Sequence, residues 1–111
     1  MQKGKKSMAI LIKTNGDIRE VKPLNGKKFT YEELREFVGG MVEIVSVPSG
    51  RTIYLNEEGK LIDLPKNEAG TALWKLEYPI EQYPNNNDEL MVGDILLLSA
   101  QEEIEQNQED E

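Results

Sequence analysis

Hydrophobic residues along this chain gather in short runs separated by turn-forming residues, a pattern typical of β-strands. Residues 8–13 and 18–22 lie on either side of Asn15-Gly16. Asn-Gly between two such runs predicts a β-hairpin with a type I′ turn, because both central residues of that turn need a positive φ. Apolar residues are sparser in 18–22, which is typical of an edge strand with one side in solvent.

A second pair of strands is expected in the middle of the chain. Residues 41–47 are β-branched and nearly continuous in their apolar character, with Glu43 as the exception. Such a run predicts a central strand covered on both faces. Residues 51–56 alternate instead, so Ile53 and Leu55 are expected on one side of the sheet.

Two further strands are expected towards the C-terminal end. Residues 57–59 fit a three-residue loop with Gly59 in the left-handed position of a bulge, and residues 60–64 are then expected to return as a strand. Residues 77–92 contain two prolines and a run of asparagines, which predicts a long loop. The apolar run at 92–99 predicts a final, buried strand.

The clearest helix start lies at Thr30. Together with Glu33 it forms a capping box, in which each side chain accepts a hydrogen bond from the backbone N–H of the other residue. Phe29 and Leu34 have the spacing of a hydrophobic staple. Paired glycines follow residue 38 and end the helix, so the sequence predicts a helix over 31–38.

A second helix is expected to begin at Asn67, whose side chain can act as the N-cap. Gly70 weakens this helix by about 1 kcal/mol relative to alanine, so a short helix of about two turns is expected. Its apolar residues recur at i, i+3, i+4 and i+7, the spacing of a buried stripe. The stripe consists of Ala69, Ala72, Leu73 and Leu76.

Together these elements predict an α+β domain over residues 8–100, with a small, mostly antiparallel sheet of about five or six strands and two short helices packed on it. Residues 1–7 contain three lysines and no acid, whereas residues 101–111 contain six acids and no base. These ends are expected to be a flexible basic arm and a disordered acidic tail.

The composition lacks the residues on which most common catalytic mechanisms depend. The chain has 111 residues, with no cysteine and no histidine, so acid–base catalysis would fall to carboxylates, lysine or tyrosine. No glycine-rich phosphate loop and no nucleophile elbow occurs in the sequence. We therefore expect a protein that is not an enzyme and that has neither a cofactor nor a bound metal.

Charge and hydropathy restrict the partners. The net charge is −8, and an acidic surface repels a phosphate backbone, so direct binding to nucleic acid is not expected. No segment approaches the roughly 20 apolar residues that span a bilayer, so we expect a cytoplasmic protein with no membrane partner. The expected partner is a protein, and the chain itself is expected to be a monomer or a weak homodimer.

Trp74 is the main candidate for a binding residue. On the predicted helix it lies away from the apolar stripe, and with Tyr78 and Tyr83 nearby it can form an aromatic contact patch of the kind found at interfaces. The alternative is that the long loop folds back over Trp74 and forms a small additional core. The sequence leaves these two interpretations open.

Two polar residues in the predicted strands are further candidates. Glu43 is either a functional carboxylate whose pKa is raised by desolvation in a buried strand, or a charge that reaches solvent or pairs with Arg35 or Arg51; the second is favoured. Asn56 begins a turn that is rich in oxygen acceptors. The ligand series of a calcium loop is missing there, so a turn with solvated charges is expected.

A set of short segments carries a resemblance to a known family. The segments are Val38-Gly39-Gly40 with Glu43, Asn56 to Leu61, Leu64 to Asn67, Ala72, and Val92-Gly93-Asp94. They resemble a small family of uncharacterised domains of unknown function that occurs largely in bacteriophage genomes, plasmids and integrated elements of bacteria. The resemblance covers roughly residues 8–99 and leaves out the acidic tail. It implies a small accessory protein with no established activity.

The expected function is that of a non-catalytic protein-binding module, an acidic accessory protein of phage or mobile-element type in the cytoplasm of a bacterial host. Its partner would be a host or phage protein. In a narrower version the acidic domain imitates DNA and inhibits a host protein that acts on nucleic acid. The alternative is a small-ligand sensor or a carboxylate-based enzyme that uses Glu43, Tyr54 or Asn56 in a pocket between sheet and helix.

Overall fold

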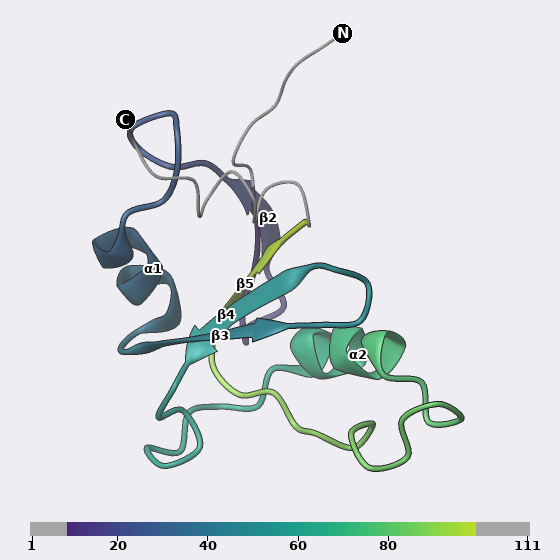
Figure 1. The fold of residues 1–111 in the computed structure, drawn as a ribbon. Coiled ribbons are helices and arrows are strands. Elements are labelled where there is room, and N and C mark those ends of the chain that lie inside the picture. The colour runs from purple at the N-terminus through teal and green to yellow at the C-terminus, as the bar shows by residue number, and fades with distance from the viewer. Residues whose placement is uncertain (1–8, 100–111) are drawn as a thin grey trace, which may run out of the picture.

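The computed structural model describes residues 9–99, so the expected basic arm and acidic tail lie outside the described residues. Residues 9–99 form an α+β fold, as predicted, with a five-stranded antiparallel sheet and two helices. The elements in chain order are β1 (Ala9–Ile12), β2 (Ile18–Val21), α1 (Tyr31–Val38), β3 (Val42–Ser46), β4 (Thr52–Asn56), α2 (Glu68–Glu77) and β5 (Ile95–Leu98) (Figure 1).

The last strand of the chain occupies the middle of the sheet. The strand order is β2-β1-β5-β4-β3, and every neighbouring pair is antiparallel. Strand β5 therefore joins the hairpin of β1 and β2 to the hairpin of β3 and β4. All of its residues are buried, which confirms the predicted final strand. The two edges of the sheet are β2, as predicted, and β3.

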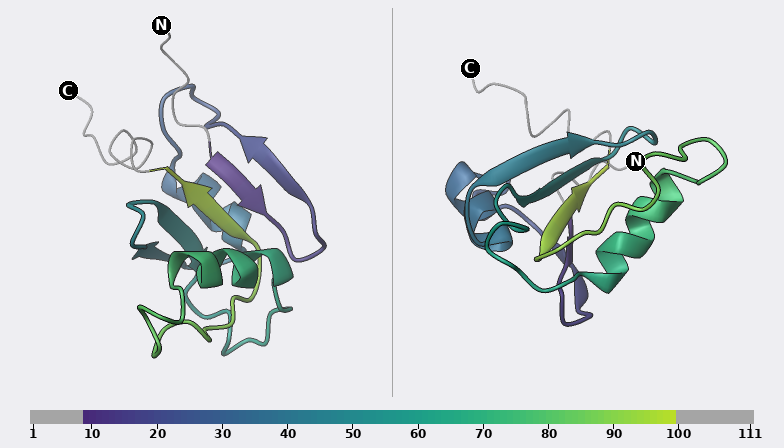
Figure 2. Two further views of the ribbon diagram at one scale, coloured as in Figure 1. Left: turned by 90° about the vertical axis from the view of Figure 1, so that its right-hand side faces the viewer. Right: turned by 90° about the horizontal axis from the view of Figure 1, so that it is seen from below.

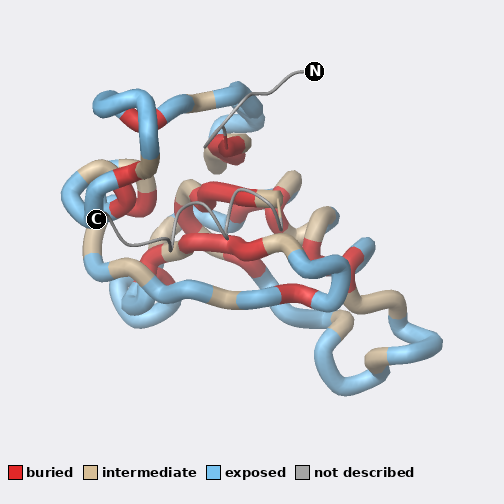
Figure 3. Tube along the Cα trace, turned by 45° about the horizontal axis from the view of Figure 1, so that its top comes forward, coloured by how far each residue is buried: buried red, intermediate tan, exposed pale blue. Residues whose placement is uncertain are grey.

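The expectation that residues 41–47 form a central strand is wrong. Among the strands of the described residues, β3 pairs with β4 alone, and both Glu43 and Ile44 are exposed. Buried residues gather instead in the inner strands (Figure 3). A β-branched run predicts a strand but not its position in the sheet, and the central place beside β4 is taken by β5, from the far end of the chain.

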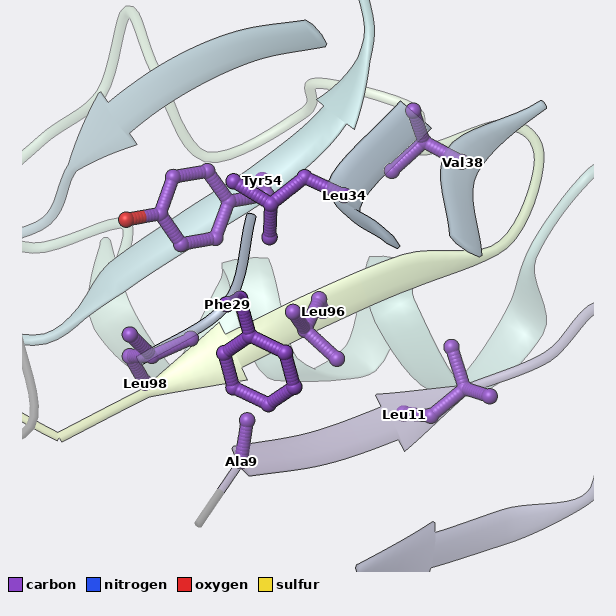
Figure 4. Close-up of a cluster of buried hydrophobic side chains, with 8 residues drawn as sticks. All are labelled: Ala9, Leu11, Phe29, Leu34, Val38, Tyr54, Leu96 and Leu98. Atoms are coloured by element: carbon purple, nitrogen blue, oxygen red, sulfur yellow. The ribbon is translucent and has the colours of Figure 1, made fainter. Parts of the chain in front are cut away.

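The sheet lies between the two helices, with α1 on one face and α2 on the other (Figure 2). Successive residues of the inner strands point alternately to the two sides. The α1 side is filled by Ala9, Leu11, Phe29, Leu34, Val38, Tyr54, Leu96 and Leu98 (Figure 4). The α2 side is filled by Ile12, Val47, Ile53, Trp74, Met91, Ile95 and Leu97, with Leu55 packed against them. The prediction that Ile53 and Leu55 share one side is confirmed.

Helix α1 begins and ends as predicted. Thr30 Oγ1 accepts from the Glu33 N–H at 3.2 Å, and Glu33 Oε1 accepts from the Thr30 N–H at 2.8 Å. The second Glu33 oxygen accepts from the Leu24 N–H at 2.8 Å. Burial raises the pKa of Glu33, but the hydrogen bonds from Thr30 and Leu24 outweigh it, and its pKa lies below the ordinary value. Gly39, at φ 80°, ends the helix.

The first hairpin forms, but not with the predicted type I′ turn. The Lys13 N–H donates to the Asp17 carbonyl at 2.9 Å, and the Gly16 N–H donates to the Lys13 carbonyl at 3.1 Å. Gly16 has a positive φ and Asn15 does not, so the connection is a three-residue loop with glycine at its left-handed position. The Asn15 side chain accepts from the Asp17 N–H at 2.9 Å, a local bond that suits this loop.

The predicted strand over residues 60–64 does not form. After β4 the chain makes consecutive turns over residues 57–63, and Asp63, not Gly59, adopts the left-handed conformation. The Asn56 side chain accepts from the Glu58 N–H at 2.8 Å and bends the chain away from the sheet. The expected bulged hairpin is therefore wrong, because β4 pairs with β3 and β5 and not with residues 60–64.

Helix α2 begins after Asn67 as predicted, but its buried face agrees only in part with the predicted one. The residues turned to the core are Gly70, Trp74 and Glu77, whereas Ala72 is exposed and Leu76 is 77% exposed. Of the predicted apolar stripe, Ala69 and Leu73 are partly buried and pack against the core, so the prediction is right for these two residues and wrong for Ala72 and Leu76. The helix is also longer than expected, at 10 residues. A Cβ on Gly70 would lie 3.0 Å from Ile95 Cδ1, so this side of the helix approaches the sheet too closely for a larger residue.

Candidate binding surface

The three aromatic residues singled out in the sequence do come together. The ring centroids of Trp74 and Tyr78 are 4.5 Å apart, and those of Tyr78 and Tyr83 are 5.0 Å apart. Trp74 is buried, and its Nε1 donates to the Asn86 carbonyl at 2.7 Å. Burial, with a smaller contribution from the charge of Glu77, raises the pKa of Tyr78. The long loop thus covers Trp74, which favours the second of the two interpretations.

The C-terminal end of α2 is held by a buried carboxylate that the sequence analysis did not single out. Glu77 Oε2 accepts from Arg51 Nη2 at 2.8 Å and from Ser49 Oγ at 2.7 Å. Burial raises the pKa of Glu77, but the hydrogen bonds from Ser49 and Arg51 outweigh it and lower the pKa below its ordinary value. Because these bonds join α2 to the turn between β3 and β4, they have a structural role.

Asn56 is also engaged in the structure. Its Nδ2 donates to the Val38 carbonyl at 3.2 Å, and its Oδ1 accepts from the Glu58 N–H. A Cβ on Gly40 would lie 2.8 Å from Asn56 Nδ2. The amide of Asn56 therefore ties the end of α1 to the end of β4, and its hydrogen-bonding groups are used within the protein.

Tyr54 lies in the core beneath α1, where its ring packs beside Leu34 (Figure 4). Only 1% of its surface is exposed. Among the strand residues that the alternative function would use, Glu43 alone is exposed.

Glu43 lines a small pocket at the edge of the sheet. The pocket has a volume of about 150 Å³. It lies where β3 and β4 meet two loops, and not between sheet and helix as expected. Its lining residues are Glu43, Leu55, Asn56, Glu57, Lys60, Leu61, Glu89, Leu90, Met91 and Val92. The apolar members come mainly from the loops, and three carboxylates stand among them. Lys60 pairs with one of these, Glu89.

The outermost strand, β3, is hydrogen-bonded to β4 beyond both of its ends. The Glu57 N–H donates to the Met41 carbonyl at 2.8 Å, and the Val47 N–H donates to the Arg51 carbonyl at 3.0 Å. Hydrogen-bonded and non-hydrogen-bonded pairs alternate along an antiparallel ladder. These two pairs therefore fix which residues between them turn their backbone groups towards β4.

Three residues of β3 turn their backbone groups away from the sheet. By this alternation the backbone N–H and C=O groups of Glu43 and Val45 point towards β4. The backbone groups of Val42, Ile44 and Ser46 point to the open edge. Within residues 9–99 no further strand pairs with this edge. The edge therefore presents a row of backbone donors and acceptors.

Apolar side chains accompany this open edge. Met41 is half exposed and Ile44 is 58% exposed, although both belong to the strand run that the sequence placed in the core. Leu61 and Leu90, which line the pocket beside Glu43, are exposed as well. The β3 edge together with this pocket is the candidate binding surface, and sequence reasoning missed it because it placed β3 inside the sheet.

Residues 9–99 contain no group of three or more Asp or Glu side chains placed to hold a metal ion. None of the helices formed by these residues is both long enough and apolar enough to span a bilayer.

Comparison with protein families gives one match. The family model described as a domain of unknown function (DUF3846) matches residues 7–110. The match includes most of the acidic tail, so the expectation that the tail lies outside the resemblance is wrong. Comparison with curated proteins and with solved structures found no match.

Proposed function

The chain belongs to the DUF3846 family of domains of unknown function, and we propose that this member is a non-catalytic protein-binding domain. The observation that carries the proposal is the contrast between the two edges of its sheet. Strand β2 contains Arg19 and Glu20 and is followed by Pro23, whereas β3 contains a single charge, Glu43. Charged residues and proline are common means of keeping an edge strand from pairing with another chain. The edge at β3 has little of this protection.

The exposed apolar residues beside β3 support the same proposal. Ile44 lies on β3, Met41 directly precedes this strand, and Leu61 and Leu90 lie at the neighbouring pocket. Leu61 and Leu90 lie with Glu43 on one side of the sheet, whereas Ile44 points to the other side, so exposed apolar residues flank the edge on both sides. Exposed apolar surface bordered by charges is typical of a protein interaction site. The absence of histidine and cysteine from the sequence supports a non-catalytic role.

A narrower version of this proposal specifies where the protein acts and what kind of partner it binds. The resemblance to phage and plasmid domains supports an accessory protein that acts in the cytoplasm of a bacterial host. The net charge of −8 supports a partner with a basic surface, such as a host protein that acts on nucleic acid. Capture of such a partner is expected to weaken as the salt concentration rises.

The proposal is tested by affinity capture from a bacterial lysate with two matched variants. Ile44 on β3 and Ile18 on β2 are each 58% exposed, and they lie on opposite edges of the same sheet. We expect Ile44→Lys to lose the protein captured by the wild type and Ile18→Lys to retain it. Both exposed substitutions should change the free energy of unfolding by no more than about 0.5 kcal/mol, which thermal unfolding checks.

Two results would count against protein binding at β3. In one, the wild type captures no protein above the background of an unrelated acidic domain. In the other, both variants capture the same protein as the wild type, which would place the contact elsewhere. Equal loss in both variants would indicate non-specific capture through charge.

The pocket beside Glu43 favours a second candidate function, the binding of a small ligand. It brings Glu43 and the edge of Asn56 to one site, although its volume of about 150 Å³ is below the 300–1,000 Å³ typical of ligand pockets. A ligand that binds the native state raises the melting temperature. A thermal-shift screen of nucleotides and metabolites with no increase, or an increase that Glu43→Gln leaves unchanged, would oppose this candidate.

A further inference from the structure

The open edge of β3 imposes a geometry on any chain that pairs with it. In an antiparallel ladder the residue opposite Glu43 would belong to a non-hydrogen-bonded pair, because Glu43 directs its backbone groups to β4. Side chains lie closest in such pairs, with Cα atoms about 4.5 Å apart. Glu43 would therefore be in direct contact with one side chain of an added strand.

The charge of this position favours one class of side chain. Opposite charges directly across two strands stabilise the pair and like charges destabilise it. Glu43 is the single charged residue of β3, and Glu57 lines the same pocket. Leu61 and Leu90 beside them offer apolar surface on which the aliphatic stem of a lysine or arginine can pack.

A second copy of this chain fits the same edge less well. Strand β3 contains no basic residue that could stand opposite Glu43, and two chains of net charge −8 repel each other. The pairing of five-residue strands alone also buries little surface compared with a stable dimer. The edge is therefore better suited to a segment of a different, basic protein.

We propose that β3 accepts an extended, antiparallel segment of a partner protein as a sixth strand, and that this segment places a lysine or arginine opposite Glu43. The inference rests on the proposed protein-binding function and adds its mode and its chemistry. The backbone groups of Val42, Ile44 and Ser46 supply the hydrogen bonds to the segment, and Glu43 selects its charge. Strand addition of this kind gains affinity from the main chain and specificity from alternate side chains.

Amide hydrogen exchange measured by NMR tests the strand addition on the full chain. The probe is a capped peptide of alternating threonine and valine with lysine at its centre, compared with the same peptide carrying glutamate there. We expect the lysine peptide to slow exchange at the Val42, Ile44 and Ser46 amides. The Glu43 and Val45 amides, which already face β4, should change little and act as internal controls.

The preference for a basic residue opposite Glu43, called the charge rule below, is tested by reversing the charge at residue 43. The lysine peptide is expected to bind about threefold to tenfold more tightly than the glutamate peptide. Lysine forms a favourable cross-strand pair with Glu43, whereas glutamate forms an unfavourable one. In Glu43→Lys the order of the two peptides should reverse. Because Glu43 is exposed, this variant should remain folded, and its amide spectrum verifies that.

Several outcomes would overturn the inference. Slowed exchange at β2, or at no strand, would reject strand addition at β3, and an unchanged peptide order in Glu43→Lys would reject the charge rule. Slowed exchange that increases with protein concentration in the absence of peptide would mean that a second copy occupies the edge. If the peptides fail while Ile44→Lys still abolishes capture from lysate, protein binding stands and only this mode of binding is rejected.

Discussion

The side-chain amide of Asn67 donates a hydrogen bond to the carbonyl oxygen of Gly93 at 2.8 Å. The same Nδ2 donates to the Ile12 carbonyl at 3.0 Å, and Oδ1 accepts from the Gly70 N–H at 2.8 Å. One fully buried side chain thus caps α2 and satisfies carbonyl groups at the end of β1 and just before β5. The place of β5 between the two hairpins therefore depends on this residue.

Removal of this amide is expected to be costly. Asn67→Ala loses a helix cap worth about 1 kcal/mol and leaves two buried carbonyl groups without this donor, each at about 1–3 kcal/mol. We expect a loss of about 3–7 kcal/mol in the free energy of unfolding, measured by urea denaturation. Asn25→Ala is the control, because Asn25 Oδ1 accepts from the backbone N–H groups of Lys27 and Lys28 in an exposed turn. A loss no larger than that of the control would contradict the prediction.

The local parts of this fold could be predicted from the sequence. Helix α1 was predicted to the residue, because Thr30, Glu33 and Gly39 form their capping bonds within one short segment. The first hairpin was predicted as an element, although the geometry of its loop was not. In both cases the residues that decide the structure are close in sequence, so propensity and spacing suffice.

The rest depends on contacts between distant segments. Strand β3 lies at an edge because β5 pairs with β4, and no property of residues 42–46 specifies that. The start of α2 is bonded through Asn67 to Ile12 and Gly93, which are distant in sequence, and only Ala69 and Leu73 of the predicted stripe pack against the core. The candidate surface was missed for the same reason, although Glu43 was correctly noted as an unusual strand residue.

Gly70→Ala is predicted to destabilise the protein, although alanine has a higher helix propensity than glycine. Alanine would favour an exposed helix position by about 1 kcal/mol. Here its Cβ would lie 3.0 Å from Ile95 Cδ1 and 3.1 Å from Asn67 Cγ, and three hydrogen bonds prevent Asn67 from moving aside. We expect a net loss of about 1 kcal/mol by urea denaturation. Gly70→Ala with increased stability would show that the contact relaxes at no cost.

The Glu77–Arg51 pair is predicted to make stability depend on pH in the acid range. The folded-state pKa of Glu77 lies below its ordinary value of 4.5, so its contribution is present above the unfolded-state pKa and is lost as pH falls through the folded-state pKa. Glu77→Gln should therefore cost about 2 kcal/mol near neutral pH and less under acidic conditions. Urea denaturation at several pH values measures this difference.

A constant cost across the pH range would contradict that assignment. Glu33 also has a lowered pKa, and it contributes to the pH dependence of both proteins. The comparison between wild type and Glu77→Gln removes this shared contribution. Glu68→Gln is a suitable control, because Glu68 lies on the same helix and is exposed.

The loop over α2 is predicted to depend on a single indole group. Trp74→Phe keeps an aromatic ring beside Tyr78 but removes the donor to the Asn86 carbonyl, which should cost about 1–2 kcal/mol. Amides of residues 79–90 should then exchange faster with solvent. The loop would lose the indole bond and keep the bond from Asn87 Nδ2 to the Tyr78 carbonyl at 2.8 Å. Tyr31→Phe, on exposed surface of α1, is the matched control. Unchanged exchange in the loop of Trp74→Phe would mean that ring packing alone holds it in place.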